Sequence, residues 1–168
     1  MIIENFNCSK CSGICCINPP ELRNIEEINK ALGFGVKVLI IKDPKSDEIL
    51  GAGVEKTKGK CPFLNDKGKC DIYENRFMAC EDFECKAKKD NKFEVLKFQA
   101  VFEIEKSSDS ASNKMNFKDI NIKMLKDKLI NSNYEIVTFM EYAEKNIYTD
   151  VDEIFMYLDK IIEENLIN

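Results

Sequence analysis

Histidine is absent from the sequence. This absence excludes Ser-His-Asp and Cys-His catalysis, and it excludes catalytic zinc sites and non-haem iron sites whose ligands include imidazole. Any metal that binds to this chain must therefore be held mainly by sulfur.

The sequence also lacks a long hydrophobic run. Its first residues are too few and too polar for a secretory signal, and no later stretch approaches the length of a membrane span. We therefore expect a cytoplasmic protein without a membrane partner. A basic excess is lacking too, because 30 acidic and 25 basic residues give a net charge of -5. This balance argues against non-specific nucleic-acid binding, and the small basic stretch 86–89 is typical of a solvated linker.

Cysteine, by contrast, is abundant and unevenly placed, with all eight residues in the first 85 positions and none in the second half. In a reducing compartment such cysteines indicate metal ligands or redox groups rather than structural disulfides. Thiolates suit zinc, Cu(I) and iron–sulfur clusters. The cysteines are Cys8, Cys11, Cys15, Cys16, Cys61, Cys70, Cys80 and Cys85.

The spacing of the cysteines supports metal binding without defining the site. Cys8 and Cys11 form a Cys-x-x-Cys turn, which places two sulfurs on one side of a loop. Adjacent Cys15 and Cys16 diverge in an extended backbone, which suggests that one of them serves a second site or a structural role. Eight sulfurs suffice for two four-cysteine sites, or for one site and spare thiols.

The motifs around the cysteines resemble those of a known family. They read Cys8-x2-Cys11-x3-Cys15-Cys16, then Cys61-Pro62-Phe63-Leu64, Cys70-x-Ile72-Tyr73, Arg76, and Cys80-x2-Phe83-x-Cys85. This pattern is similar to that of the YkgJ-like cysteine-cluster proteins, described as a zinc- or iron-chelating domain. The resemblance covers about residues 8–85 and not the tail. It implies that the eight cysteines are the metal ligands and that Arg76 and Tyr73 belong to the frame of the site.

One departure from the family pattern follows Arg76, where Phe77 stands in place of the usual proline. We expect a less rigid turn there, without contact to a proposed ligand. Arg76 either offsets the negative charge of a thiolate site or lies on the surface without a partner. Tyr73 is expected to be a core or supporting residue rather than a catalytic acid. Flagellin lysine methylases share this type of cysteine motif, but nothing here indicates a methyl-donor pocket.

The first half of the chain predicts short helices and strands. Asn18 followed by two prolines predicts a helix over 20–32 that Gly33 ends. Strands are predicted over 36–42 and 49–55, and a hairpin is predicted around the turn at 65–68. A short helical turn is expected at 76–80.

The second half predicts one strand and several helices. Apolar residues alternate over 93–104 as in a half-buried strand, and 106–114 is a polar loop. Helices are predicted over 117–130, 134–145 and 150–162. Helical spacing favours packing between these helices, rather than a ligand groove, for the long apolar side chains Met124, Phe139, Met140, Phe155 and Met156.

Together these features predict an α+β protein, in which a small cysteine-rich metal-centred domain is followed by a helical C-terminal region. We expect regions 1–90 and 91–168 to pack as one domain. The leading interpretation is a carrier, sensor or accessory protein with a thiolate-bound iron–sulfur cluster, slightly favoured, or Zn2+. The alternatives are an iron–sulfur enzyme for redox chemistry or protein methylation, and a zinc-stapled module that binds another protein.

Overall fold

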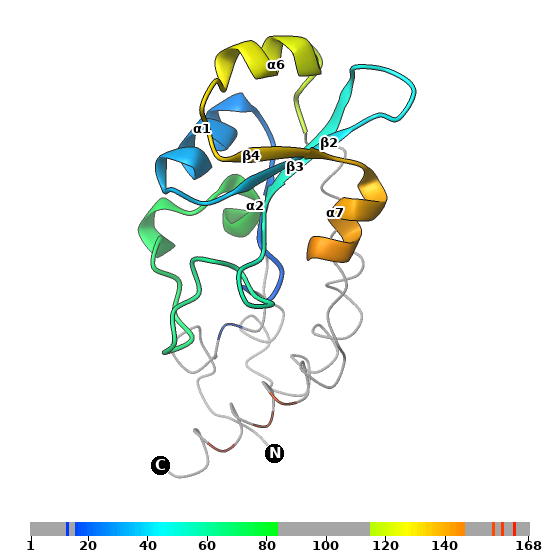
Figure 1. Ribbon diagram of the computed structural model, residues 1–168. Helices are drawn as coiled ribbons and strands as arrows, with labels where there is room; N and C mark the ends of the chain where they lie inside the picture. Colours follow the sequence, from blue (N-terminus) through cyan, green and yellow to red (C-terminus); the bar gives the residue numbers. More distant parts are fainter. Residues whose placement is uncertain are drawn as a thin grey trace.

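The computed structural model describes Gly13, residues 16–83 and 115–146, and the single positions Met156, Asp159 and Glu163 (Figure 1). The strand predicted at 93–104 and the loop predicted at 106–114 lie outside the described residues. So does the last predicted helix, apart from the three single positions, which are helical. The described part contains a small mixed sheet with helices, which confirms the predicted α+β class.

A four-stranded sheet forms the centre of the described fold, in the order β1-β3-β2-β4. The two predicted strands are confirmed as β2 (Val38–Lys42) and β3 (Ile49–Val54), and they pair with each other as an antiparallel hairpin. The short strand β1 (Glu21–Leu22) pairs antiparallel with the outer edge of β3. Strand β4 (Tyr134–Val137) pairs parallel with the outer edge of β2, so the second half of the chain completes a sheet that the first half begins.

The first helix begins later than the sequence pattern predicts. Helix α1 spans Ile25–Gly33, and the Asn24 side chain caps it by accepting a hydrogen bond from the Glu27 amide at 2.9 Å. The predicted start at residue 20 is wrong, because Glu21 and Leu22 are held extended by pairing with β3. Gly33 is the last helical residue, and the left-handed backbone that ends the helix occurs at Gly35, with φ +77.

The predicted helix over 134–145 is wrong in its first part, because Tyr134–Val137 forms β4. A parallel partner distant in the sequence, β2, fixes this segment as a strand. Helix α7 follows as Phe139–Asn146, and Thr138 with Glu141 forms a reciprocal capping box before it. Helix α6 spans Ile122–Lys128 within the predicted 117–130, and it starts after the capping residue Asn121.

The two faces of the sheet pack against different helices. On one face, Val38 and Ile40 belong to the main core, which includes residues of α1 and α6. On the other face, Leu39 and Ile41 pack with Val137 and with Tyr142 of α7. Alternation along β2 thus supplies apolar side chains to both layers.

The expected packing role of the long apolar tail residues is wrong for those that are described. Met124, Phe139, Met140 and Met156 have exposed fractions of 44%, 56%, 58% and 71%. Phe155 lies outside the described residues. Attachment of α7 depends instead on Tyr142 and Ala143, which are buried.

Candidate metal centre

Four of the eight predicted ligands lie in the described part of the chain, namely Cys16, Cys61, Cys70 and Cys80. Cys61 is buried, and the other three are half-buried. Cys8, Cys11, Cys15 and Cys85 lie outside the described residues. Within the described ranges, no three cysteine, aspartate or glutamate side chains are grouped closely enough to hold a metal ion.

The two predicted cysteine groups meet at Cys16 and Cys61. The Cys61 amide donates a hydrogen bond to the Cys16 carbonyl oxygen at 3.0 Å, although 44 residues separate the two cysteines. The next residue after Cys16, Ile17, is buried with an exposed fraction of 1%. Core packing at Ile17 therefore fixes the end of the first cysteine group beside the start of the second.

A tight turn brings Cys70 back toward Cys61. The Leu64 amide donates to the Cys61 carbonyl oxygen at 3.0 Å, and Leu64 forms an isolated bridge with Cys70. Asn65 organises the turn because its Oδ1 accepts from the amides of Lys67 and Lys69 at 3.0 and 3.1 Å. The predicted hairpin is confirmed as a turn closed by one bridge rather than by long strands.

Gly13 packs the first cysteine group against this same turn. Its backbone is left-handed, with φ +77, and a Cβ placed there would lie 2.5 Å from Leu64 Cδ1 and 3.2 Å from the Gly68 carbonyl oxygen. Only glycine combines that conformation with so close an approach. Gly13 was not predicted as a site residue, and its position between Cys11 and Cys15 is the signal that the sequence offers.

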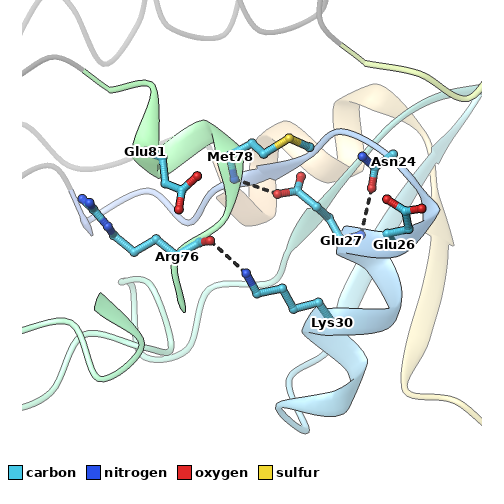
Figure 2. A pocket seen from close by; sticks show the side chains of 7 residues that line it. All are labelled: Asn24, Glu26, Glu27, Lys30, Arg76, Met78 and Glu81. Atoms are coloured by element: carbon cyan, nitrogen blue, oxygen red, sulfur yellow. Dashed lines mark hydrogen bonds between the residues drawn. The ribbon is translucent and has the colours of Figure 1, made fainter. Parts of the chain in front are cut away.

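Cys80 lies on helix α2 (Met78–Glu81), which follows the 3-10 turn η2 (Tyr73–Asn75). The helical turn predicted at 76–80 is confirmed with a shift of about one to two residues at each end. The Glu27 carboxylate of α1 caps α2, because its Oε1 accepts from the Met78 amide at 2.7 Å (Figure 2). Its Oε2 accepts from the Arg23 amide at 2.8 Å. A negative charge at a helix N-terminus is stabilising, so α1 directs the start of the helix that carries Cys80.

Two cations next to this contact hold the rest of the Cys80 segment. Arg23 Nη1 pairs with Asp82 Oδ2 at 2.5 Å, at the C-terminal end of α2. Lys30 Nζ donates to the Arg76 carbonyl oxygen at 2.9 Å (Figure 2). Glu27, Arg23 and Lys30 were not predicted as site residues.

Phe77 anchors the same segment in the core. It is fully buried, its ring centroid lies 5.9 Å from that of Phe63 and 6.3 Å from that of Phe34, and the Lys30 ammonium lies 5.3 Å from it. Aromatic packing thus holds the position where the expected pattern has proline, and the lower rigidity of the turn stays a prediction. The expectation that Phe77 contacts no proposed ligand residue is wrong, because its carbonyl oxygen accepts a hydrogen bond from the Cys80 amide at 2.9 Å. The backbone still suits proline, since φ is -76 at Phe77.

Arg76 and Tyr73 interact with each other. The Arg76 Cζ lies 4.1 Å from the Tyr73 ring centroid, a cation–π geometry. Tyr73 is 42% exposed, so it is not a core residue. The Arg76 Nε is buried and has no hydrogen-bond partner among the described residues. Figure 2 shows the guanidinium directed away from Glu27 and Lys30.

Comparison with known proteins identifies the cysteine-rich part. Residues 7–108, more than half of the chain, match the model of the CxxCxxCC family, described as "Putative zinc- or iron-chelating domain". This match confirms the resemblance drawn from the cysteine motifs. No curated protein and no solved structure matches the chain. None of the helices in the described part has the length and apolar character needed to cross a membrane.

Proposed function

Because the chain belongs to the CxxCxxCC family of zinc- or iron-chelating domains, we propose that it holds its metal through cysteine thiolates and acts as a carrier, sensor or accessory protein. The proposed ligands are the eight cysteines of the first half. No histidine competes for the metal, and thiolates are soft ligands suited to zinc and to iron–sulfur clusters.

The observation that carries this proposal is the meeting of the two cysteine groups. Cys16 and Cys61 are joined by a backbone hydrogen bond, and Gly13 seats the first group on the turn that leads to Cys70. Segments distant in the sequence thus bring the backbones of Cys16 and Cys61 together. A four-sulfur site there would combine described cysteines with some of Cys8, Cys11, Cys15 and Cys85.

The buried Nε of Arg76 fits an anionic centre. A buried donor without an acceptor costs free energy, roughly 1–3 kcal/mol, so an acceptor supplied by the loaded site would stabilise the protein. Four thiolates around a divalent cation carry a net negative charge, which a guanidinium offsets. We propose this role for Arg76, with Tyr73 holding its guanidinium plane by stacking.

For the metal itself, we propose an iron–sulfur cluster ahead of Zn2+. Four cysteines within nine residues, Cys8 to Cys16, resemble the clustered ligands of iron–sulfur proteins. A cluster would supply electron transfer or redox sensing when bound. A reducing cytoplasmic location suits either metal.

We propose further that regions 1–90 and 91–168 form one domain. The parallel pairing of β4 with β2 supports this, because the sheet includes strands from both regions. The metal-bearing region would then depend on the second half for its full stability. Any partner protein would meet the assembled domain rather than a separate tail.

Anaerobic purification with analysis of iron, zinc and acid-labile sulfide tests the proposal. Cys61→Ser should lower the bound metal. The double variant Cys61→Ser with Ser46→Cys should not restore it, although the exposed Ser46 position returns the thiol count to eight. Equal metal content in wild type and both variants would contradict a defined site that uses Cys61. A brown protein containing sulfide supports the cluster, and a colourless zinc protein supports the stapled interaction module.

A further inference from the structure

Glu21 lies on the edge strand β1, at the position that pairs with Gly53 of β3. Its neighbour Leu22 is fully buried in the main core, so alternation along the strand turns Glu21 toward the opposite face of the sheet, where α7 packs. The Oε2 atom of Glu21 is buried and has no hydrogen-bond partner in the part of the chain that the structure describes. A carboxylate in such a position needs an explanation beyond packing.

Helix α7 lies against the strand next to Glu21. A Cβ at Gly53 would meet the hydroxyl oxygen of Tyr142 and would lie 2.9 Å from two of its ring carbon atoms, so the ring lies directly on the β3 backbone. The next helical turn is fixed by Asn146, whose Nδ2 donates to the Val54 carbonyl oxygen at 2.8 Å. Tyr142 also interacts electrostatically with Glu21.

No positively charged side chain among the described residues forms a hydrogen bond or ion pair with the Glu21 carboxylate. Arg23, which follows the last residue of β1, acts on Glu21 through space, but its Nη1 is engaged by Asp82. From α7, Lys145 engages Glu55 and Glu135 instead. Burial therefore prevails over the attraction of Arg23 and raises the pKa of Glu21 from 4.5 to about 7.

The other elements that pack against β1 add no compensating charge at Glu21. In α1, the Glu27 carboxylate is engaged by backbone amides. In α2, Glu81 is exposed, and the C-cap residue Asp82 pairs with Arg23. On the α7 side, burial raises the pKa of Tyr142 to about 12, so its hydroxyl stays neutral over the physiological range.

We propose that Glu21 is a proton-controlled contact between strand β1 and helix α7. The neutral carboxyl lies beside Tyr142 at little cost, and α7 stays seated on the sheet. The ionised carboxylate is a partly buried charge without a hydrogen-bonded partner, and it weakens the attachment of α7. This inference does not rest on metal binding.

The direction of the pH dependence follows from proton linkage. The folded state holds the Glu21 proton more tightly than the state with α7 detached, so attachment is strongest below pH 4.5 and weakens as pH rises to about 7. Above that range the stabilisation from the neutral form is lost, and no further change comes from this group.

Hydrogen exchange of the full-length purified protein tests the proposal. The exchange of the peptide that contains α7 is followed at pH 5.0 and pH 8.0, and the exchange times are corrected for the pH dependence of the intrinsic exchange rate. Protection of α7 in wild type should fall by roughly 50- to 100-fold between the two pH values, as proton linkage with pKa values of 4.5 and about 7 requires. Glu21→Gln should keep the same protection at both. The matched control Glu26→Gln removes an exposed carboxylate nearby in the sequence and should behave like wild type.

Two results would overturn the proposal: wild-type α7 protection that does not change with pH, or a Glu21→Gln variant that retains the wild-type change. If Glu21→Gln does not fold, Glu21→Met serves as a second variant with the same expected outcome, and the wild-type measurement stands by itself. Metal loss at pH 5.0 would affect Glu26→Gln and wild type alike, so only the difference between variants is assigned to Glu21.

Discussion

The carboxylate of Glu27 and the backbone amide of Met78 are hydrogen-bonded at 2.7 Å, across 51 positions of the sequence. Helix α2 contains four residues, and a helix of that length has no stability by itself. Its N-terminus is therefore organised from outside, by a side chain of α1. The position of Cys80 depends in this way on a glutamate that is not a proposed ligand.

Replacement of Glu27 by alanine should leave the buried Arg23 amide and the partly buried Met78 amide without acceptors. We expect the free energy of unfolding to fall by about 2–4 kcal/mol, measured by chemical denaturation with circular dichroism. Glu26→Ala is the matched control, since Glu26 is the exposed neighbour on the same helix, and its effect should stay within about 0.5 kcal/mol. Equal effects of the two replacements would contradict the capping role.

Substitutions at Phe77 test whether side-chain packing or a restricted backbone φ holds this turn. Phe77→Ala should cost about 3–5 kcal/mol because a fully buried ring is removed. Phe77→Pro should cost a similar amount, although φ -76 at this position and the extended backbone of Arg76, with ψ 162, both suit proline. Denaturation of both variants beside Phe139→Ala, at a 56% exposed ring, checks this. A proline variant as stable as wild type would show that packing is not what holds the turn.

Gly53 should not tolerate a methyl group. Gly53→Ala would force Tyr142 off the sheet, and we expect a loss of about 1–3 kcal/mol with a lower melting temperature. Gly33→Ala is the control, because nothing lies within 4 Å of an added Cβ there. Since Gly33 ends α1, that change should stabilise the protein by about 0.4–1 kcal/mol. Opposite signs for the two replacements are the expected result.

Gly13 links packing to metal content. Gly13→Ala combines a left-handed backbone with a collision against Leu64, whereas Gly35→Ala has the same φ of +77 and open space around it. Both changes should cost stability through the backbone, by about 1 kcal/mol. Only Gly13→Ala should lower the metal-to-protein ratio, measured by elemental analysis. A wild-type metal-to-protein ratio in Gly13→Ala would show that metal binding does not depend on the packing of Gly13 against the 64–68 turn.

Local patterns in the sequence predicted the elements that local interactions determine. Strands β2 and β3 and the Asn65 turn follow from strand-forming runs and turn residues close in the chain. Tyr134–Val137 was mistaken for the start of a helix because its partner, β2, is remote in sequence. The helix start was placed too early for a similar reason, since pairing with β3 holds Glu21 and Leu22 extended.

The sequence predicted the cysteine ligands of the candidate site but not the residues that hold the cysteine segments in place. Cysteine spacing and the family motifs identified the ligands now proposed, of which Cys16 and Cys61 are brought together. Glu27, Arg23 and Gly13 gave no comparable signal, because a buried carboxylate, a buried guanidinium and a close-packed glycine are recognised only by their neighbours.

The parallel pairing of β4 with β2 has a consequence for the order of synthesis. The ribosome delivers β1, β2 and β3 early, and residues 134–137 emerge only after the whole cysteine-rich region. Until then one edge of β2 is open, and Leu39 and Ile41 have no Val137 to cover them. Nascent chains in this interval are exposed to aggregation. Soluble yield should therefore fall sharply when translation stops before β4, whatever metal is supplied to the cells.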